Sequence, residues 1–198
     1  LIETCIDSND AGGTGRGAGV AALDSRLEWR GGHLRGNRGA RDGGGLDLES
    51  CPQVQGTGLV IDGNQAARQG GGVASRNSSL AFAACRITGN QAGEFGGGVH
   101  STGDTLGLES SLCAANTAGN IGGGLHLTRS VAALLNVTVA RNAGGPASGI
   151  YWAEDGSGSS MHGCIVAENV LGGAAWTGGT APLADWNLYF ANGGLDRL

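Results

Sequence analysis

The chain has 198 residues, of which 41 are glycine, and its 12 basic and 17 acidic side chains give a net charge of −5. All of the basic residues other than histidine are arginine, and the negative balance argues against a nucleic-acid partner, which needs clustered positive charge. No run of 18 or more apolar residues is present, so this segment is not expected to insert into a membrane.

An asparagine recurs along the whole chain with a period of about 26 residues. Its positions are Asn9, Asn37, Asn64, Asn90, Asn116, Asn142, Asn169 and Asn192. A second marker, the apolar residue that closes each glycine cluster, has the same period and occupies Val20, Leu46, Val73, Val99, Leu125 and Ile150. Two independent markers that share one period predict a solenoid of repeated turns.

Within each turn, apolar residues alternate with other residues over short stretches. In chain order, the clearest examples are residues 46–48, 80–82, 85–87, 106–108, 125–127 and 150–152. Period two predicts strands with one buried face, and no glycine-free amphipathic stretch is long enough for a helix. We therefore expect an all-β chain: a right-handed parallel β-helix of about seven or eight turns, each of about 26 residues and three short strands.

The asparagine positions also predict which residues face the interior. The residues three positions before each asparagine are expected to form an inward stack: Ile6, Leu34, Ile61, Ile87, Cys113, Val139, Val166 and Tyr189. The asparagines of the regular turns are expected to form a structural ladder at a strand-ending corner: Asn37, Asn64, Asn90, Asn116, Asn142 and Asn169. The glycines that recur every turn are expected at corners with positive φ, and not in a phosphate loop, because no helix follows them.

Two recurring motifs carry a resemblance to a known family. The first is "GGGL" at 43–46 and 122–125 and "GGGV" at 70–73 and 96–99; the second is "IDGN", "ITGN", "VARN" and "VAEN". The pairing resembles the Gly-Gly-Ala and Phe-x-x-Asn repeats of the chlamydial polymorphic outer membrane proteins and related adhesin-like β-helices, with Ile or Val in place of Phe. The resemblance implies surface display and adhesion and no catalysis.

Residues 1–198 are expected to form a single β-helix domain that is a segment of a larger protein. The period degrades near Trp176, Trp186, Tyr189 and Phe190, so residues 172–198 are expected to form an irregular last turn and a partial C-terminal cap. Partners are expected to be other domains or chains of a larger assembly, stacked end to end, and glycans. The expected location is extracellular or at the cell surface.

Few residues are candidates for chemistry. His100 and His126 fall on adjacent turns in a column expected to face outward, where a solvated pair is expected and a metal site is the weaker alternative because two ligands are too few. Asn77 in "NSS" and Asn136 in "NVT" are candidate glycosylation sites in corner or outward positions. No cofactor and no catalytic residue is predicted.

The five cysteines are expected to be mostly buried thiols. No disulfide is expected between Cys85 and Cys113, because they lie two residues out of register and too far apart. The function expected is that of a non-catalytic scaffold or display surface. The alternative is a polysaccharide-active enzyme of the lyase or epimerase kind, or a carbohydrate-binding module, on the same fold. The acidic residues are scattered through the repeat, so no acid–base pair is predicted.

Overall fold

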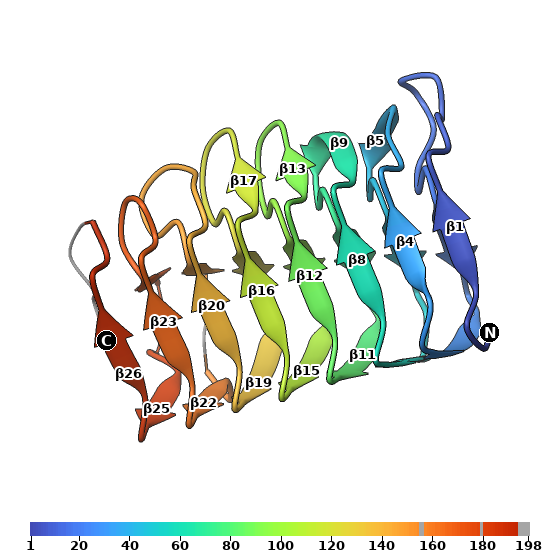
Figure 1. Cartoon of the computed structure of the whole chain (residues 1–198). Helices are drawn as coiled ribbons and strands as arrows, with labels where there is room; N and C mark the ends of the chain where they lie inside the picture. Colours follow the sequence, from blue (N-terminus) through green and yellow to red (C-terminus); the bar gives the residue numbers. More distant parts are fainter. Residues whose placement is uncertain (155–156, 179, 194–198) are drawn as a thin grey trace.

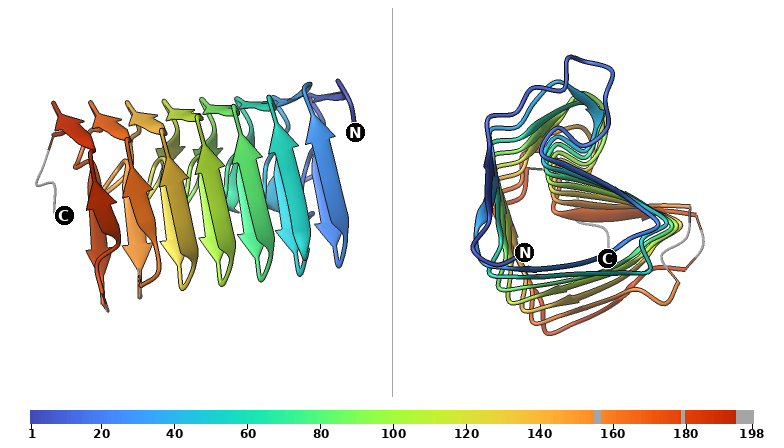
Figure 2. Two further views of the ribbon diagram at one scale, coloured as in Figure 1. Left: turned by 90° about the horizontal axis from the view of Figure 1, so that it is seen from below. Right: turned by 90° about the vertical axis from the view of Figure 1, so that its right-hand side faces the viewer.

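A computed structural model of the chain describes residues 1–154, 157–178 and 180–193. The described residues form strands and corners and no helix, and the chain coils as a right-handed parallel β-helix (Figure 1). The predicted fold class is therefore confirmed. Seen along the axis, successive turns superimpose (Figure 2).

Strands from successive turns pair in parallel to form three long sheets. Sheet 1 contains β1 (Cys5–Asp7), β4 (His33–Arg35), β8 (Val60–Asp62), β12 (Arg86–Thr88), β16 (Leu112–Ala114), β20 (Thr138–Ala140), β23 (Ile165–Ala167) and β26 (Leu188–Phe190). Sheet 2 contains β2 (Val20–Leu23), β6 (Leu46–Glu49), β10 (Val73–Arg76), β14 (Val99–Thr102), β18 (Leu125–Thr128), β21 (Ile150–Ala153) and β24 (Ala174–Thr177). Sheet 3 contains β3 (Arg26–Arg30), β7 (Gln53–Thr57), β11 (Ser79–Ala83), β15 (Thr105–Glu109), β19 (Val131–Leu135), β22 (Ser160–His162) and β25 (Leu183–Asp185).

A fourth, shorter sheet was not predicted. Sheet 4 contains β5 (Ala40–Asp42), β9 (Gln65–Gln69), β13 (Gln91–Ala92) and β17 (Thr117–Ala118). Its strands form an arm of four turns, between the asparagine and the glycine cluster, and the chain folds back from the arm toward sheet 2 (Figure 2). The fold-back needs glycine: a Cβ atom at Gly97 would lie 2.4 Å from the carbonyl oxygen of Thr117 and 2.5 Å from that of Gly123.

The core is a set of columns that run along the solenoid. The predicted inward stack is confirmed, since Leu34, Ile61, Ile87 and their equivalents pair in register across sheet 1 and are fully buried, with Ile6 and Tyr189 partly buried at the two ends. Successive strands lie about 4.8 Å apart, so each member contacts its equivalent in the next turn.

The corners have a regular backbone conformation. Residues with positive φ stand at the corners that follow the strands of sheets 1, 2 and 3, and non-glycine residues such as Asp24, Ala84 and Arg141 occupy many of these positions. An L-residue in this conformation costs about 1–2 kcal/mol, so the hydrogen bonds between turns must offset that cost.

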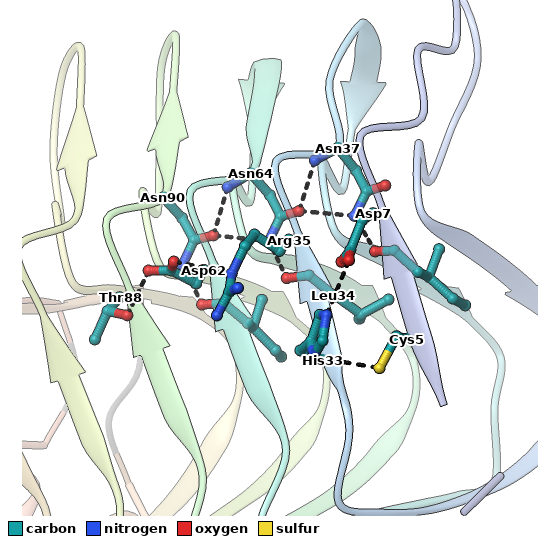
Figure 3. Close-up of polar contacts among 12 residues, drawn as sticks. Cys5, Asp7, His33, Leu34, Arg35, Asn37, Asp62, Asn64, Thr88 and Asn90 are labelled. Carbon is teal, nitrogen blue, oxygen red and sulfur yellow. Dashed lines mark hydrogen bonds and ion pairs between the residues drawn. The ribbon is translucent and has the colours of Figure 1, made fainter. Parts of the chain in front are cut away.

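The asparagine ladder supplies such bonds and is confirmed (Figure 3). The backbone N–H and the Nδ2 of Asn90 both donate to Oδ1 of Asn116, at 2.9 and 3.0 Å. Nδ2 of Asn90 also donates to the carbonyl oxygen of Ile61, at 2.9 Å. The same pattern continues from Asn37 to Asn169, and all members are buried.

A second ladder lies at the corner between sheets 2 and 3. The backbone N–H of Cys51 donates to Oγ of Ser78, that of Ser78 to Oδ1 of Asp104, and that of Asp104 to Oγ of Ser130. Short polar side chains thus link successive turns by hydrogen bonds at this corner, as the asparagines do at the corner that follows sheet 1.

Within residues 172–198, three strands continue the sheets as far as Phe190. The irregular last turn and partial cap expected for this segment stay a prediction. Trp176 packs against the core, whereas Trp186 is 84 % exposed. The shortened period reflects a shorter arm, since Asn169 still pairs with Asn192 through 3.0 Å hydrogen bonds. Residues 179 and 194–198 lie outside the described residues.

Candidate functional site

The outer face of sheet 2 is covered in the middle of the solenoid. In β14 and β18, the first three residues are all buried, because Val99 and Leu125 face the core while the next residues face the folded-back arm. His100 and His126 are only 4 % and 6 % exposed. Both rings face away from the core, as expected, but the expectation that they are solvated is wrong, because the arm with Phe95 folds over both rings.

The two imidazoles form part of an aromatic stack, which we call the histidine seam: Phe95, His100, His126 and Tyr151. The rings of His100 and His126 are 5.0 Å apart and nearly parallel, and the Phe95 and Tyr151 rings lie 5.0 and 5.4 Å from His126. Nδ1 of His100 is buried without a hydrogen-bond partner. Across the described residues, no group of three or more His, Cys, Asp or Glu side chains is placed to hold a metal ion.

Burial sets the protonation of the seam. Loss of hydration lowers the pKa of His100 to about 3, and the neighbouring His126, Arg76 and Arg68 act in the same direction. Burial likewise lowers the pKa of His126 to about 4. Both rings are therefore neutral at neutral pH, and the packing of the arm depends on that neutrality.

Falling pH is expected to destabilise the fold through this pair. The folded-state pKa values lie below the ordinary 6.5, so the unfolded chain binds more protons below pH 6.5 and stability declines as pH drops toward 4. Between pH 7 and pH 5 the pair should cost roughly 2–4 kcal/mol. Burial raises the pKa of Asp47 and Asp104, which acts in the opposite direction.

Urea denaturation of the wild type and of the His100→Gln/His126→Gln variant at both pH values measures this cost. The variant should lose less stability on acidification. The aspartates contribute equally in both proteins, so subtracting the loss of the variant from that of the wild type leaves the contribution of the histidines. His162→Gln, which changes an exposed histidine, should behave like the wild type. An equal loss in the double variant and the wild type would contradict the assignment.

At the N-terminal end of the same face, charged side chains pair with one another. Asp47 accepts from Arg16 at 3.0 Å and from Arg76 at 3.1 Å, and Arg76 also donates to Asp42 at 2.9 Å. Arg16 contacts Glu49 as well. These carboxylates are engaged by arginine, so none is poised as a free acid or base.

A second cluster, which the sequence reasoning missed, lies on the outer face of sheet 1. Ile6 and Leu34 point inward, so their neighbours Cys5, Asp7 and His33 point outward from β1 and β4, where Cys5 pairs in register with His33. Nδ1 of His33 is 3.4 Å from Sγ of Cys5, and its Nε2 is 2.9 Å from Oδ2 of Asp7 (Figure 3). We call these three residues the thiol–imidazole–carboxylate cluster.

The sequence did contain a signal for this cluster. Cys5 and His33 both stand four residues before a ladder asparagine, which places them in one column, and Asp7 stands on the same face two residues after Cys5. The remaining cysteines differ, because they are buried and burial raises the pKa of three of their thiols, that of Cys113 to about 12. All five cysteines are free, as expected for Cys85 and Cys113.

The candidate glycosylation residues Asn77 and Asn136 lie at corners, with φ of 50° and 53°, and both are exposed. Their placement at outward corners is confirmed, and their modification stays a prediction.

Comparison with known proteins adds no assignment to these sites. No family model matches the chain, and no curated protein matches it in sequence. In the described part of the chain, no helix is long and apolar enough to cross a membrane.

Proposed function

We propose that the chain is a non-catalytic structural module that serves as a rigid scaffold or display surface in an extracellular or cell-surface assembly. The observation that carries this proposal is the continuity of the three long sheets, whose strands pair from turn to turn, in sheet 1 from β1 to β26. Each turn is bonded to its neighbours along three sheets, so the solenoid resists bending. The extracellular location is supported by the resemblance of its repeats to surface β-helices and by two exposed sequons.

The two ends of the solenoid support end-to-end contacts with other domains or chains. Among the described residues, β1 and β2 at one end and β24, β25 and β26 at the other have one side without a strand partner, which other chains can extend, whereas β3 is bridged by Ile2. Large apolar side chains are exposed at both ends, with Ile2 at 75 %, Leu183 at 77 % and Trp186 at 84 %. These surfaces fit stacking partners, and glycans are the other class of partner that we propose.

Two hollows along the side of the solenoid have at most one ionisable side chain each. One of about 390 Å³ over sheet 4 is lined by Gly, Ala, Gln and Thr residues and by no ionisable side chain. Another of about 340 Å³ on sheet 3 contains Glu109 as its one ionisable residue. Neither has the two carboxylates that glycoside hydrolysis requires.

An enzyme acting on acidic glycans is the second candidate function, and one observation favours it. A hollow of about 520 Å³ near the N-terminal end is lined by Glu3, Glu28 and Arg30. Nε of Arg30 donates to Glu28 at 2.7 Å, which neutralises one of the two carboxylates.

Incubation with a panel of polyuronates and neutral glycans, with and without Ca²⁺, distinguishes the two functions. The scaffold proposal predicts no new reducing or unsaturated chain ends above a buffer control. Cleavage that the Glu3→Gln/Glu28→Gln variant loses would overturn it and assign the activity to this hollow. Binding without cleavage would support the display surface and identify the glycan partner.

A further inference from the structure

Cys5 differs from the other cysteines in what its thiol contacts. The thiols of Cys51, Cys85 and Cys164 are buried and donate to backbone carbonyl oxygens. Cys5 is exposed, and its Sγ lies 3.4 Å from Nδ1 of His33. The carbonyl oxygen of Glu3 is farther from Sγ, at 3.7 Å. It is therefore a surface thiol with a base beside it.

The carboxylate of Asp7 determines how that base is oriented. A carboxylate can only accept, so the 2.9 Å contact assigns the imidazole proton to Nε2 of His33. Nδ1 then presents its lone pair to Sγ of Cys5. Asp7 and His33 are both partly exposed, at 43 % and 27 % of their side chains, so the cluster is open to a partner.

The arrangement is that of a nucleophile, a base and an orienting group, and not that of a metal site. Cys5 and Asp7 contact opposite nitrogens of one ring, so their donor atoms do not converge on a common point. Nucleophilic thiols in proteins are recognised by a base within hydrogen-bond reach that a third group holds in place.

We propose that Cys5, His33 and Asp7 form a nucleophilic thiol site that exchanges with an accessible disulfide of a partner molecule. The thiol proton passes to Nδ1 of His33, and the Cys5 thiolate attacks one sulfur of the disulfide. A new S–S bond forms, the old one breaks, and the departing thiolate takes the proton from the imidazolium. The Cys5 sulfur is oxidised and the departing sulfur is reduced, so no further reactant is needed.

Disulfide exchange fits this site better than acyl transfer does. Attack on a carbonyl creates an oxyanion that needs hydrogen-bond donors, and the described contacts of Sγ of Cys5 are an imidazole nitrogen and a carbonyl oxygen. Exchange with a disulfide creates no oxyanion and requires only an open approach and a proton for the leaving thiolate. The inference goes beyond the scaffold function and does not depend on it.

The test is the rate at which the folded chain forms a mixed disulfide with oxidised glutathione, followed by peptide mapping at pH 6.5 and pH 8. In the wild type the label should appear on Cys5, and Cys5→Ser should abolish it. His33→Gln should slow the reaction at pH 6.5 by about tenfold or more and less at pH 8, because hydroxide replaces the base. Asp7→Asn, a change to a positioning residue, should give an intermediate rate with the same pH trend.

His162→Gln is the matched control, because Nδ1 of His162 is 2.7 Å from Asp185 in an equivalent surface pair. It should leave the rate unchanged, and unchanged urea midpoints should show that every variant is folded. Equal rates for the wild type, His33→Gln and Asp7→Asn at both pH values, or labelling at the buried cysteines first, would overturn the proposal.

Discussion

Asn90→Ala is expected to lower the free energy of unfolding by about 3–5 kcal/mol, a large effect for one side chain. Oδ1 of Asn90 accepts from the backbone N–H and Nδ2 of Asn64, at 2.9 and 3.0 Å. Its Nδ2 donates to the carbonyl oxygen of Ile61. Alanine leaves these buried groups without partners, and each such group costs about 1–3 kcal/mol.

Urea denaturation followed by circular dichroism measures this loss. Asn120→Ala is the control, because Asn120 is exposed and lies outside the ladder, and it should change stability by less than about 0.5 kcal/mol. If the two variants were equally stable, the ladder would not be the main polar contribution to the fold.

The sequence predicts the fold well because one residue type marks each turn. Each buried asparagine forms hydrogen bonds with backbone groups and with the equivalent asparagine of the next turn, so its replacement would lower the stability of the fold. The same residue therefore recurs in every turn, and the period can be read from the sequence. The inward stack follows by counting three residues back. The second ladder is less visible, because Cys51, Ser78, Asp104 and Ser130 share a position but no residue type.

The burial of the histidine seam could not be predicted from period two. Alternation says which face of a strand a residue occupies and does not say whether another part of the chain covers that face. The cover comes from the arm that carries Phe95, whose fold-back depends on backbone contacts of glycines such as Gly97. A continuous buried run such as that of β14 is the structural result of two covered faces.

The thiol–imidazole–carboxylate cluster was missed for a different reason. Its members are 26 and 28 residues apart along the chain, and they meet only because β1 and β4 pair in register. In a solenoid, residues one turn apart in the sequence are neighbours in space, so a functional site can consist of residues at equivalent positions of adjacent turns and leave no local sequence motif.

Removal of one whole turn is expected to leave a folded protein, whereas removal of half a turn is expected to unfold it. Deleting residues 91–116 joins Asn90 to Thr117, which already follows the equivalent Asn116, and places β11 on β19 with apolar residues facing apolar residues. Deleting residues 91–103 joins Asn90 to Asp104, which shifts every later column out of register. Stability in a solenoid is nearly a sum over turns and their interfaces, so the first deletion loses only one turn.

Small-angle scattering of these two deletion variants, together with urea denaturation, tests most directly whether the solenoid is a rigid stack of self-contained turns. The variant without residues 91–116 should unfold cooperatively and should be shorter than the wild type by about 5 Å, one strand spacing. The variant without residues 91–103 should be expanded and should show no cooperative transition. If the whole-turn deletion were as unfolded as the half-turn deletion, the solenoid would not be a stack of self-contained turns.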